Sequence, residues 1–580
     1  MSGVLSRLAG RLRTGDLVTG ISRLLALACL VGLVGMLPWL SGKDPALTIL
    51  RATSSDREPT PEVLASIRKS IGIDGGPLHV IGHWLAGVAR GDLGRSWVSG
   101  ADVGPDAVDA FGVSLSLMAA ALGVGVIVAA ALVLPALRDG LRGRPRPRGG
   151  AASAVLISLP EYLLAPILML VLAVYLRILP PFGWGSPEKV IMPALSLGLP
   201  TGGYLGGLVS DAVTATFSER WVATWSTAGI RGRTLAGAVL RRALAPLTGQ
   251  VALVVVALTG GAVAVEKIFA IPGLGRELLD AASAQDVPAL QAQILLLLAL
   301  ALTTGVIAGA VRRLLMGRAA GAGGLTAPPP VEHPGRAARV IAVSGAALLA
   351  LMVAVGIRRD PYAVVADKLA QPSAALPLGA DSLGRDVLAR VAHGAVSTVS
   401  GAVIVTVVCF VIAILVGLAP RAATGFIEVA NAAPPILAGL IVAGVSGPSA
   451  TGAAIAVAGV GWAPLASHAA GLVAENRQRP DVLLAPVLGE GRVRITLTRV
   501  LPAVVGPLAR HAALRLPGKA LALAALGFLG LGAQSPAPEW GLVLSDALPY
   551  IERAPWAVAT PAAALVVLSI TSVAASRSMR

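Results

Sequence analysis

The sequence contains fragments of a phosphate-binding and a metal-binding pattern, but neither pattern is complete. Gly518-Lys519 is followed by Ala520 where a phosphate-binding loop needs Ser or Thr, and the upstream glycine is missing. His79 and His83 have the spacing of two ligands on one helix face, without a nearby cysteine or a matching carboxylate. A solvated amphipathic face explains this pair more simply. We therefore predict no catalytic residue, no metal site and no bound cofactor in this chain.

Two basic loops lie at matching places in the two halves of the chain, and each contains a glycine. The first loop runs from Ser218 to Pro246 through Gly229, and the second runs from Arg479 to Pro507 through Gly489. Long apolar stretches flank both loops, so we expect them in the cytoplasm next to a membrane. One such loop in each copy of a membrane domain provides a contact site on which a separate cytoplasmic protein can exert force. The sequence therefore favours a transporter that is driven by a separate protein.

The composition supports a membrane protein and argues against a soluble one. The chain has 580 residues, of which 55% are hydrophobic and 13% are charged, whereas soluble domains carry roughly 25% charged residues. The formal net charge is +16, but the arginines stand in short loops between apolar runs, where they set topology rather than bind nucleic acid. Cys29 and Cys409 both lie in apolar runs, so no disulfide framework is indicated.

Apolar runs that are long enough to cross about 30 Å of hydrocarbon predict an all-α membrane protein with about 12 transmembrane helices. The weakest runs are 190–210 and 425–445. The first run is too long for a signal peptide. The predicted spans are 21–40, 113–136, 152–177, 190–210, 248–270, 290–311, 339–356, 398–419, 425–445, 451–472, 503–530 and 556–575.

The arginines predict the orientation of these spans. The segments 138–148, 220–242, 312–339 and 477–499 each carry several arginines and fall on the same side if the N-terminus is inside. Both termini are then cytoplasmic. The two long segments on the outer side, 41–112 and 357–397, mix both signs of charge and are exempt from the rule because of their length.

A linker rich in Gly, Ala and Pro at 317–337 divides the chain into two copies, 1–316 and 338–580. Each copy holds six predicted spans. Because six is an even number, the two copies enter the membrane from the same side and are parallel repeats. A short repeated motif supports the duplication. It reads Leu93-Gly94-Arg95 in the first copy and Leu383-Gly384-Arg385 in the second, and in each copy it precedes the second span.

Several motifs in order resemble the permease subunits of bacterial dipeptide, oligopeptide and nickel ABC importers. The first half resembles one partner of that permease pair and the second half resembles the other, fused end to end. The motifs of the first half are Arg90-Gly91-Asp92-Leu93-Gly94-Arg95-Ser96, Leu179-Pro180-Pro181-Phe182-Gly183-Trp184, Pro193-Ala194-Leu195-Ser196-Leu197-Gly198, Val265-Glu266-Lys267-Ile268-Phe269 and Pro272-Gly273-Leu274-Gly275. Those of the second half are Pro377-Leu378-Gly379-Ala380-Asp381-Ser382-Leu383-Gly384-Arg385-Asp386, Gly527-Phe528-Leu529-Gly530-Leu531-Gly532 and Trp540-Gly541.

The resemblance implies that each cytoplasmic loop holds a short coupling helix that docks on an ATPase. The family motif falls on Ala223-Thr224-Trp225 with Gly229, and on Leu483-Leu484-Ala485 with Gly489. Both copies lack the acidic residue of the family pattern, and Pro486 falls inside the second expected helix. An ordinary basic loop is the alternative interpretation. The residues expected to couple to the ATPases are Trp221, Val222, Trp225, Gly229, Asp481, Val482, Ala485 and Gly489. In the first loop Trp221, Val222 and Trp225 have the spacing of one apolar face.

The outer segments are expected to receive a substrate-binding lipoprotein. The family motifs in these segments contribute Asp92, Gly94, Arg95, Asp381, Gly384, Arg385 and Asp386. Within the spans, Glu428 with Asn431 is interpreted first as a contact between helices, and Glu161 similarly. We expect a translocation path lined by small and apolar side chains, with selection left to the binding protein.

The expected function is the permease component of an ABC importer in a bacterial cell membrane, coupled to two cytoplasmic ATPases. The resemblance implies short peptides as substrates, with nickel or its chelates second. Two other classes stay open. A degenerate membrane scaffold would explain the departures in the two loops, and a proton-coupled secondary transporter would need carboxylates or histidines near the middle of the membrane.

Overall fold

The structure is a computed structural model that describes residues 2–40, 44, 46–47, 49–50, 58–70, 76–145, 150–316 and 336–578. The described residues form helices and no strand, with only three isolated β-bridges. This confirms the prediction of an all-α protein. Nearly all of the predicted linker 317–337, together with parts of the outer segment 41–112, lies outside the described residues.

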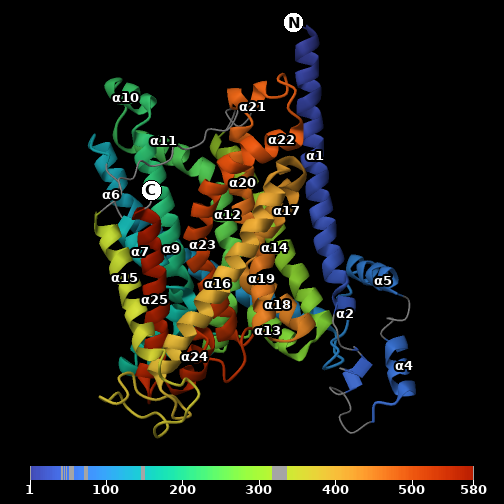
Figure 1. The fold of residues 1–580 in the computed structure, drawn as a ribbon, viewed down its shortest axis with the longest axis vertical. Helices are drawn as coiled ribbons and strands as arrows, with labels where there is room; N and C mark the ends of the chain where they lie inside the picture. Colours follow the sequence, from blue (N-terminus) through green and yellow to red (C-terminus); the bar gives the residue numbers. More distant parts are fainter. Residues whose placement is uncertain are drawn as a thin grey trace. The chain divides into compact units, whose positions relative to one another are not determined.

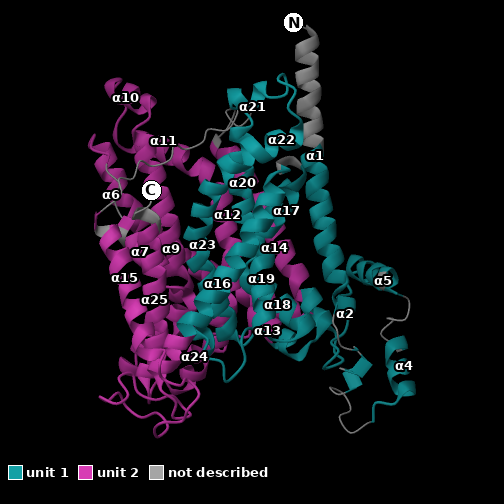
Figure 2. Ribbon diagram, viewed as in Figure 1, with its two compact units in different colours: residues 1–104, 280–292, 394–542 teal, residues 105–279, 293–393, 543–580 magenta. Residues whose placement is uncertain are grey.

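The chain divides into two compact units, each built from parts of both sequence halves (Figure 2). Unit 1 comprises Met1–Gly104, Asp280–Ala292 and Gly394–Leu542, and unit 2 comprises Pro105–Leu279, Gln293–His393 and Val543–Arg580. The helices of unit 1 are α1 (Ser2–Gly35), α2 (Leu37–Leu40), α4 (Pro61–Ser70), α5 (Pro77–Ala89), α17 (Pro420–Ala432), α18 (Pro435–Ser446), α19 (Ala450–Gly461), α20 (Ala463–Asn476), α21 (Pro480–Leu484), α22 (Arg492–Ile495), η5 (Thr496–Val500) and α23 (Leu501–Leu529).

Unit 2 contains the remaining helices, some of which cross a unit boundary (Figure 1). Those wholly in unit 2 are α7 (Gly150–Ile157), α8 (Glu161–Leu168), η2 (Met169–Tyr175), α9 (Pro187–Phe217), α10 (Arg220–Thr227), α11 (Gly232–Leu244), η3 (Ala245–Leu247), α12 (Thr248–Phe269), α15 (Arg336–Gly356), η6 (Leu548–Tyr550) and α25 (Pro555–Ser578). Those crossing a boundary are α6 (Val103–Leu141), α13 (Leu274–Ala284), α14 (Val287–Met316), α16 (Val387–Gly417) and α24 (Trp540–Ala547).

The first helix of the chain packs within unit 1 against α17, which comes from the second sequence half. Ser22 Oγ donates to the carbonyl of Ala422 at 2.6 Å, and Arg23 binds both carboxylate oxygens of Glu428 at 2.7 Å. A Cβ at Gly425 would lie 2.3 Å from the carbonyl oxygen of Ser22, so glycine permits this close approach. Glu428 therefore makes the contact between helices that the sequence indicated. Because packing mixes the two halves, the units do not test the copy boundaries, which stay a prediction.

Nine helices in the described part of the chain are long and apolar enough to cross a membrane, or ten if one bent pair is a single span. The bent pair is Ala422–Ala432 with Pro435–Ser446, at 88°, and it corresponds to the predicted span 425–445. The span 152–177 is likewise divided, because Pro160 precedes α8. Proline lacks an amide hydrogen and starts a new helix at both places. The count of twelve is therefore not confirmed.

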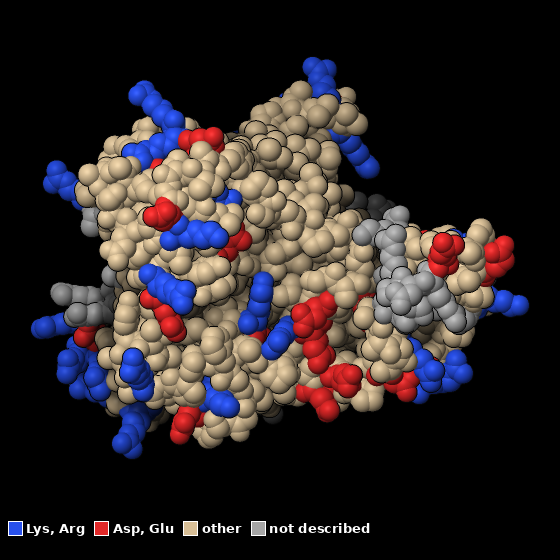
Figure 3. Space-filling view, turned by 90° about the horizontal axis from the view of Figure 1, so that it is seen from below, with Lys and Arg blue, Asp and Glu red and all other residues tan. Residues whose placement is uncertain are grey.

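Each unit carries the helices of its predicted coupling loop at one end. In unit 2, α10 lies at the end opposite to the loop between α15 and α16, and in unit 1, α21 lies at the end opposite to α5 (Figure 1). Figure 3 shows both acidic and basic side chains on the face that it draws.

Candidate functional site

The loop of copy one folds as a helix, a left-handed glycine and a second helix. α10 ends before Gly229, whose φ of 84° is costly for other residues, and α11 follows. The amide of Ile230 donates to the carbonyl of Trp225 at 2.9 Å and closes the end of α10. Gly229 thus sets the angle between the two helices.

One side chain anchors α10 to the body of unit 2. Val222 is buried in a cluster with Phe217 and Leu235, and Trp221 packs partly against the same cluster. Glu219, just before the helix, accepts a hydrogen bond from Trp221 Nε1 at 2.7 Å and pairs with Arg242 at 3.0 Å. α10 is therefore fixed by an apolar contact and an ion pair.

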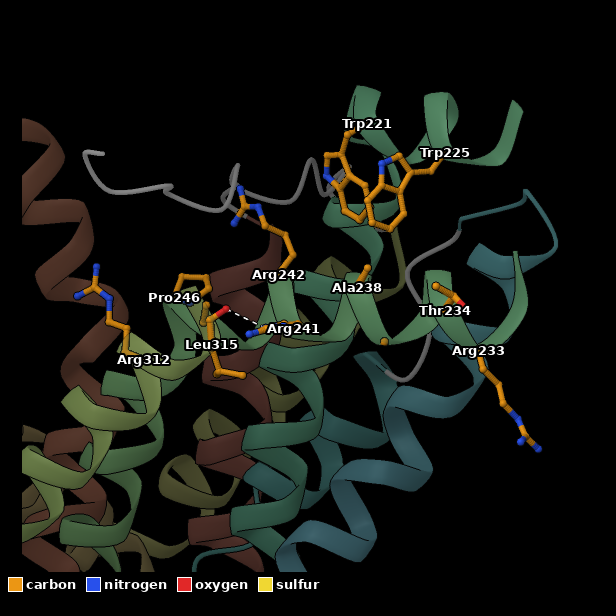
Figure 4. A pocket seen from close by; sticks show the side chains of 12 residues that line it. Trp221, Trp225, Arg233, Thr234, Ala238, Arg241, Arg242, Pro246, Arg312 and Leu315 are labelled. Atoms are coloured by element: carbon orange, nitrogen blue, oxygen red, sulfur yellow. Dashed lines mark hydrogen bonds between the residues drawn. The ribbon is translucent and has the colours of Figure 1, made fainter. Parts of the chain in front are cut away.

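The predicted single apolar face of α10 is divided in the structure. Val222 is turned into the core, while Trp221 and Trp225 form an edge-to-face pair with ring centroids 5.2 Å apart. The two rings stand over α11 and wall a cavity of about 600 Å³ (Figure 4). The other lining residues include Ala238, Arg241, Arg242, Pro246, Arg312 and Leu315. The cavity is thus bounded by aromatic rings on one side and by basic helix ends on the other.

The loop of copy two repeats this construction with a shorter helix. α21 ends at Leu484, two residues before Pro486, and Gly489 has a φ of 81°. The amide of Glu490 donates to the carbonyl of Ala485 at 3.1 Å, as Ile230 does to Trp225 in copy one. The proline that the sequence placed inside the helix therefore shortens the helix without changing its closing turn.

Matching residues are buried in the two loops. Val482 stands seven residues before Gly489, as Val222 stands before Gly229, and both valines are buried. Ala485 is also buried. Around the turn Arg499 donates from Nε to Glu490 at 3.0 Å and from Nη1 to the carbonyl of Asp481 at 3.2 Å. The predicted coupling residues therefore fall at equivalent places in the two loops.

The second loop presents an apolar surface in place of the tryptophan pair. Its four side chains are between 59% and 82% exposed, which is unusual for large aliphatic residues on a polar loop. We call this set the loop-two apolar surface: Leu483, Leu484, Val487 and Leu488.

The outer motif of copy two is a buried ionic network. Asp381 binds the guanidinium of Arg385 at 2.7 Å and that of Arg390 at 2.8 Å, and Arg390 also reaches Asp546 at 3.4 Å. Burial opposes ionisation of Asp381, but hydrogen bonds from the amides of Arg385 and Leu383 and from the Arg385 side chain hold its pKa below the ordinary value. The network therefore contains an ionised carboxylate between two guanidinium groups.

Two further residues of this motif fix the backbone around the network. Asp386 caps the start of α16 by accepting from the amide of Leu388 at 2.8 Å, and it pairs with Arg359 at 2.7 Å. Gly384 has a φ of 83°, and a Cβ there would lie 2.2 Å from the carbonyl oxygen of Ala366. All four predicted residues of this motif thus lie in one buried structure.

The outer motif of copy one is more open. Arg95 pairs with Asp102 at 3.0 Å, and both side chains are mostly exposed. Asp92 accepts from the amide of Gly94 at 2.9 Å within the same turn. The buried carboxylate near this motif is Asp286, which accepts from Ser96 Oγ and, at 3.0 Å, from the amide of Trp97.

A pair of buried glutamates was not predicted as a site. Glu266 accepts from Ser114 Oγ at 2.6 Å and from the amide of Arg276 at 3.0 Å, at the start of α13. Glu539 accepts from the amide of Gly541 at 2.9 Å and from Thr398 Oγ1 at 3.2 Å, at the start of α24. Each carboxylate thus caps a short helix, where the helix dipole favours negative charge.

The two glutamates come from different places in the chain relative to the helices that they cap. Glu266 belongs to the preceding helix α12, whereas Glu539 directly precedes the helix that it caps. A Cβ at Gly527 would lie 1.9 Å from Glu539 Oε2, so glycine leaves the space that this carboxylate fills. The two glutamates occupy different positions in the sequences of their copies. A comparison of the sequence motifs of the two copies therefore does not match one glutamate with the other.

The sequence analysis also overlooked basic residues inside a predicted span. The run 503–530 contains Arg510, His511, Arg515 and Lys519, all on α23. The expectation of a path lined by small and apolar side chains did not take these four residues into account. The available signal was the spacing of four residues that separates His511, Arg515 and Lys519.

Comparisons with known proteins agree with this architecture. The family described as "Binding-protein-dependent transport system inner membrane component" matches residues 150–320 and 411–578. The peptide transport system permease protein SapC of Escherichia coli O6:H1 is 35% identical over 33% of this chain and 67% of its own length. The metal-staphylopine import system permease protein CntB of Staphylococcus aureus strain NCTC 8325 is 30% identical over 48% of this chain and 89% of its own length.

A third relative, the glutathione transport system permease protein GsiC of Salmonella choleraesuis, is 32% identical over 50% of this chain and 90% of its own length. None of these three matches extends over more than half of the chain, as expected when two permease copies follow one another. The chain belongs to the family of binding-protein-dependent transport system inner membrane components, and it contains the family's domain twice.

Proposed function

We propose that this chain forms the whole membrane path of an ABC importer for short peptides, and that two cytoplasmic ATPases move it. Loop one, from Trp221 to Gly229, and loop two, from Asp481 to Gly489, are the proposed docking elements. The observation that carries this proposal is their shared construction, with a buried valine, a closing hydrogen bond and a left-handed glycine at equivalent positions. Two unrelated basic loops have no reason to share all three features.

The construction of each loop suits the transmission of force. Val222 and Val482 tie the short helices to their units, so that a push on either helix reaches the body of the unit. The loop-two apolar surface and the exposed ring of Trp225 remain available for contact. Exposed apolar patches on a protein surface mark interaction sites. The missing acidic residues of the family pattern are thus replaced by apolar contact area.

Short peptides are the proposed substrates because the names of two relatives refer to the transport of peptides. SapC is named for peptide transport, and GsiC is named for transport of glutathione, which is itself a tripeptide. A metal chelate is the second candidate, since CntB is named for import of metal-staphylopine. The outer segments 41–112 and 357–397 are the proposed seat of the binding protein, with both chain termini in the cytoplasm.

The test is co-purification with candidate ATPases from the same cell, followed by reconstitution in liposomes with a candidate binding protein. We expect peptide and binding protein together to stimulate ATP hydrolysis and to drive uptake. The variant Leu488→Asp places a charge on the loop-two apolar surface and should abolish co-purification. Its matched control is Ile178→Asp, which changes a similarly exposed aliphatic residue in the predicted outer loop and should leave co-purification intact.

Two outcomes contradict the proposal. If no ATPase co-purifies with the wild-type chain, the departures in both loops are losses of function and the scaffold interpretation takes precedence. If uptake follows a proton gradient without ATP, the chain is a secondary transporter.

A further inference from the structure

Three basic side chains form a stripe along one face of α23. His511, Arg515 and Lys519 are spaced by four residues, which places them one above another on a helix. We call this set the basic stripe. It lies wholly within unit 1, in the candidate membrane span Arg492–Leu529.

The stripe lies deep in the membrane-spanning part of the helix. At a rise of about 1.5 Å per residue, Lys519 is roughly 15 Å and His511 roughly 27 Å from the end of α23 at Leu529. The hydrocarbon core is about 30 Å thick. The stripe therefore extends from the middle of the bilayer toward its cytoplasmic half.

Neighbouring groups hold His511 and Arg515, the two N-terminal residues of the stripe, in place. The ring of His511 stacks on that of His468 from α20, with centroids 4.3 Å apart. Arg515 Nε donates to His511 Nε2 at 3.1 Å, so this nitrogen is the acceptor of the bond. The guanidinium of Arg515 is thereby oriented, while its side chain remains exposed.

Lys519 is buried beside α19 and α16. Only 5% of the residue is exposed, and a Cβ at Gly461 of α19 would lie 3.4 Å from its Cε and 3.3 Å from the sulfur of Cys409 in α16. Within the described part of the chain, no carboxylate forms an ion pair with Lys519. Burying an ammonium without a carboxylate is expensive, so its presence calls for a functional reason.

The corresponding helix of copy one shows that the fold does not require such a stripe. α12 carries no charged residue from Thr248 to Val265. Its first charged residue, Glu266, is already bound by Ser114 and by the amide of Arg276. Of these two helices, only α23 carries cationic groups in this stretch.

We propose that the basic stripe is a binding site for the carboxylate of an anionic substrate as it crosses the membrane. Lys519 and Arg515 supply the positive charge, and the two stacked histidines hold Arg515 in place. Cationic side chains within membrane spans face the bundle interior or a water-filled cavity rather than lipid chains. The site favours peptides that carry an extra carboxylate. This inference rests on the proposed function and names its preferred substrate class.

The test compares uptake of Ala-Glu-Ala with that of Ala-Gln-Ala, two peptides that differ by one charge, in liposomes containing the complex with its ATPases and binding protein. Any preference of the binding protein is the same for every permease variant, so a change in the uptake ratio reports on the permease. We expect the ratio to fall roughly tenfold in Lys519→Met and in Arg515→Gln, as for loss of a hydrogen bond between charged groups.

Arg510→Gln is the matched control, because Arg510 neighbours His511 but lies off the stripe. Its uptake ratio should equal that of the wild type. Arg515→Gln changes an exposed residue and carries the test if Lys519→Met does not assemble. The inference is overturned if both peptides are taken up and the ratio stays at its wild-type value in the stripe variants, or if Arg510→Gln lowers the ratio equally. No ATP-driven uptake of either peptide by the wild type contradicts the proposed function, and this inference with it.

Discussion

The two outer motifs share Leu-Gly-Arg but use it in opposite ways. In copy one the side chain of Arg95 is 77% exposed and pairs with Asp102 at the surface. In copy two the side chain of Arg385 is 5% exposed and belongs to a network with Asp381 and Arg390. The difference shows that a repeated motif can keep its backbone turn while its charges change from a surface pair to a structural element.

The largest expected effect comes from removing the carboxylate at the centre of the buried network. Asp381→Ala leaves the guanidinium groups of Arg385 and Arg390 buried without their shared partner, which costs about 3–5 kcal/mol. The equivalent change in copy one, Asp102→Ala, breaks an exposed pair and costs about 1 kcal/mol or less. Thermal unfolding in detergent measures both. Similar decreases in stability for the two variants would show that burial does not determine how much each ion pair contributes to stability.

A smaller difference is expected for the glycines of the same motifs. Gly94 and Gly384 both have positive φ values, so an alanine at either position costs roughly 1–2 kcal/mol. At Gly384 the new Cβ would also lie 2.2 Å from the carbonyl oxygen of Ala366, whereas at Gly94 the nearest atom is 3.7 Å away. Gly384→Ala should therefore lower the unfolding temperature more than Gly94→Ala. Equal decreases in unfolding temperature would indicate that the loop around Gly384 moves to accommodate the new Cβ without loss of stability.

These pairs also show what the sequence could and could not predict. Hydropathy and motif order were sufficient for the helical class, the duplication and the positions of Gly229 and Gly489, because these depend on local pattern. The breaks at Pro160 and Pro434 were visible as prolines, but whether each bends a span depends on packing. The burial of Arg390 and Glu539 depends on contacts between distant segments, such as that between Thr398 and Glu539. The stripe on α23 was visible in the sequence and was missed because the span was judged by its average hydropathy.

The free energy of unfolding should depend on pH through one buried carboxylate of the second copy, Glu539. Burial raises the pKa of Glu539 to about 7, although three hydrogen bonds favour its ionised form. Between pH 4.5 and 7 the folded chain then binds a proton that the unfolded chain has lost, so the free energy of unfolding decreases as pH rises through this window. The effect is on the order of 3 kcal/mol.

Glu539→Gln mimics the protonated acid and removes this titration. We expect the unfolding temperature of the wild type to fall from pH 5 to pH 8 relative to that of Glu539→Gln. Asp546→Asn, which changes an acidic residue of the neighbouring helix α24, is the control and should leave the wild-type pH dependence in place. A constant difference between the wild type and Glu539→Gln over this range would mean that Glu539 stays ionised.

The smallest expected difference is between the hydroxyl groups that serve the two glutamate caps. Ser114 Oγ donates to Glu266 and accepts from the amide of Leu274 at 2.8 Å, so it links the carboxylate to α13. Thr398 makes a single, longer bond to Glu539. Ser114→Ala removes two buried hydrogen bonds, and Thr398→Val removes one while it keeps the shape of the side chain. Because a buried hydrogen bond contributes about 1 kcal/mol, Ser114→Ala should destabilise the chain by about 1 kcal/mol more than Thr398→Val. Chemical denaturation in mixed micelles measures the difference. The reverse order would show that Glu539, which directly precedes the helix that it caps, depends more on its hydroxyl partner than Glu266 does.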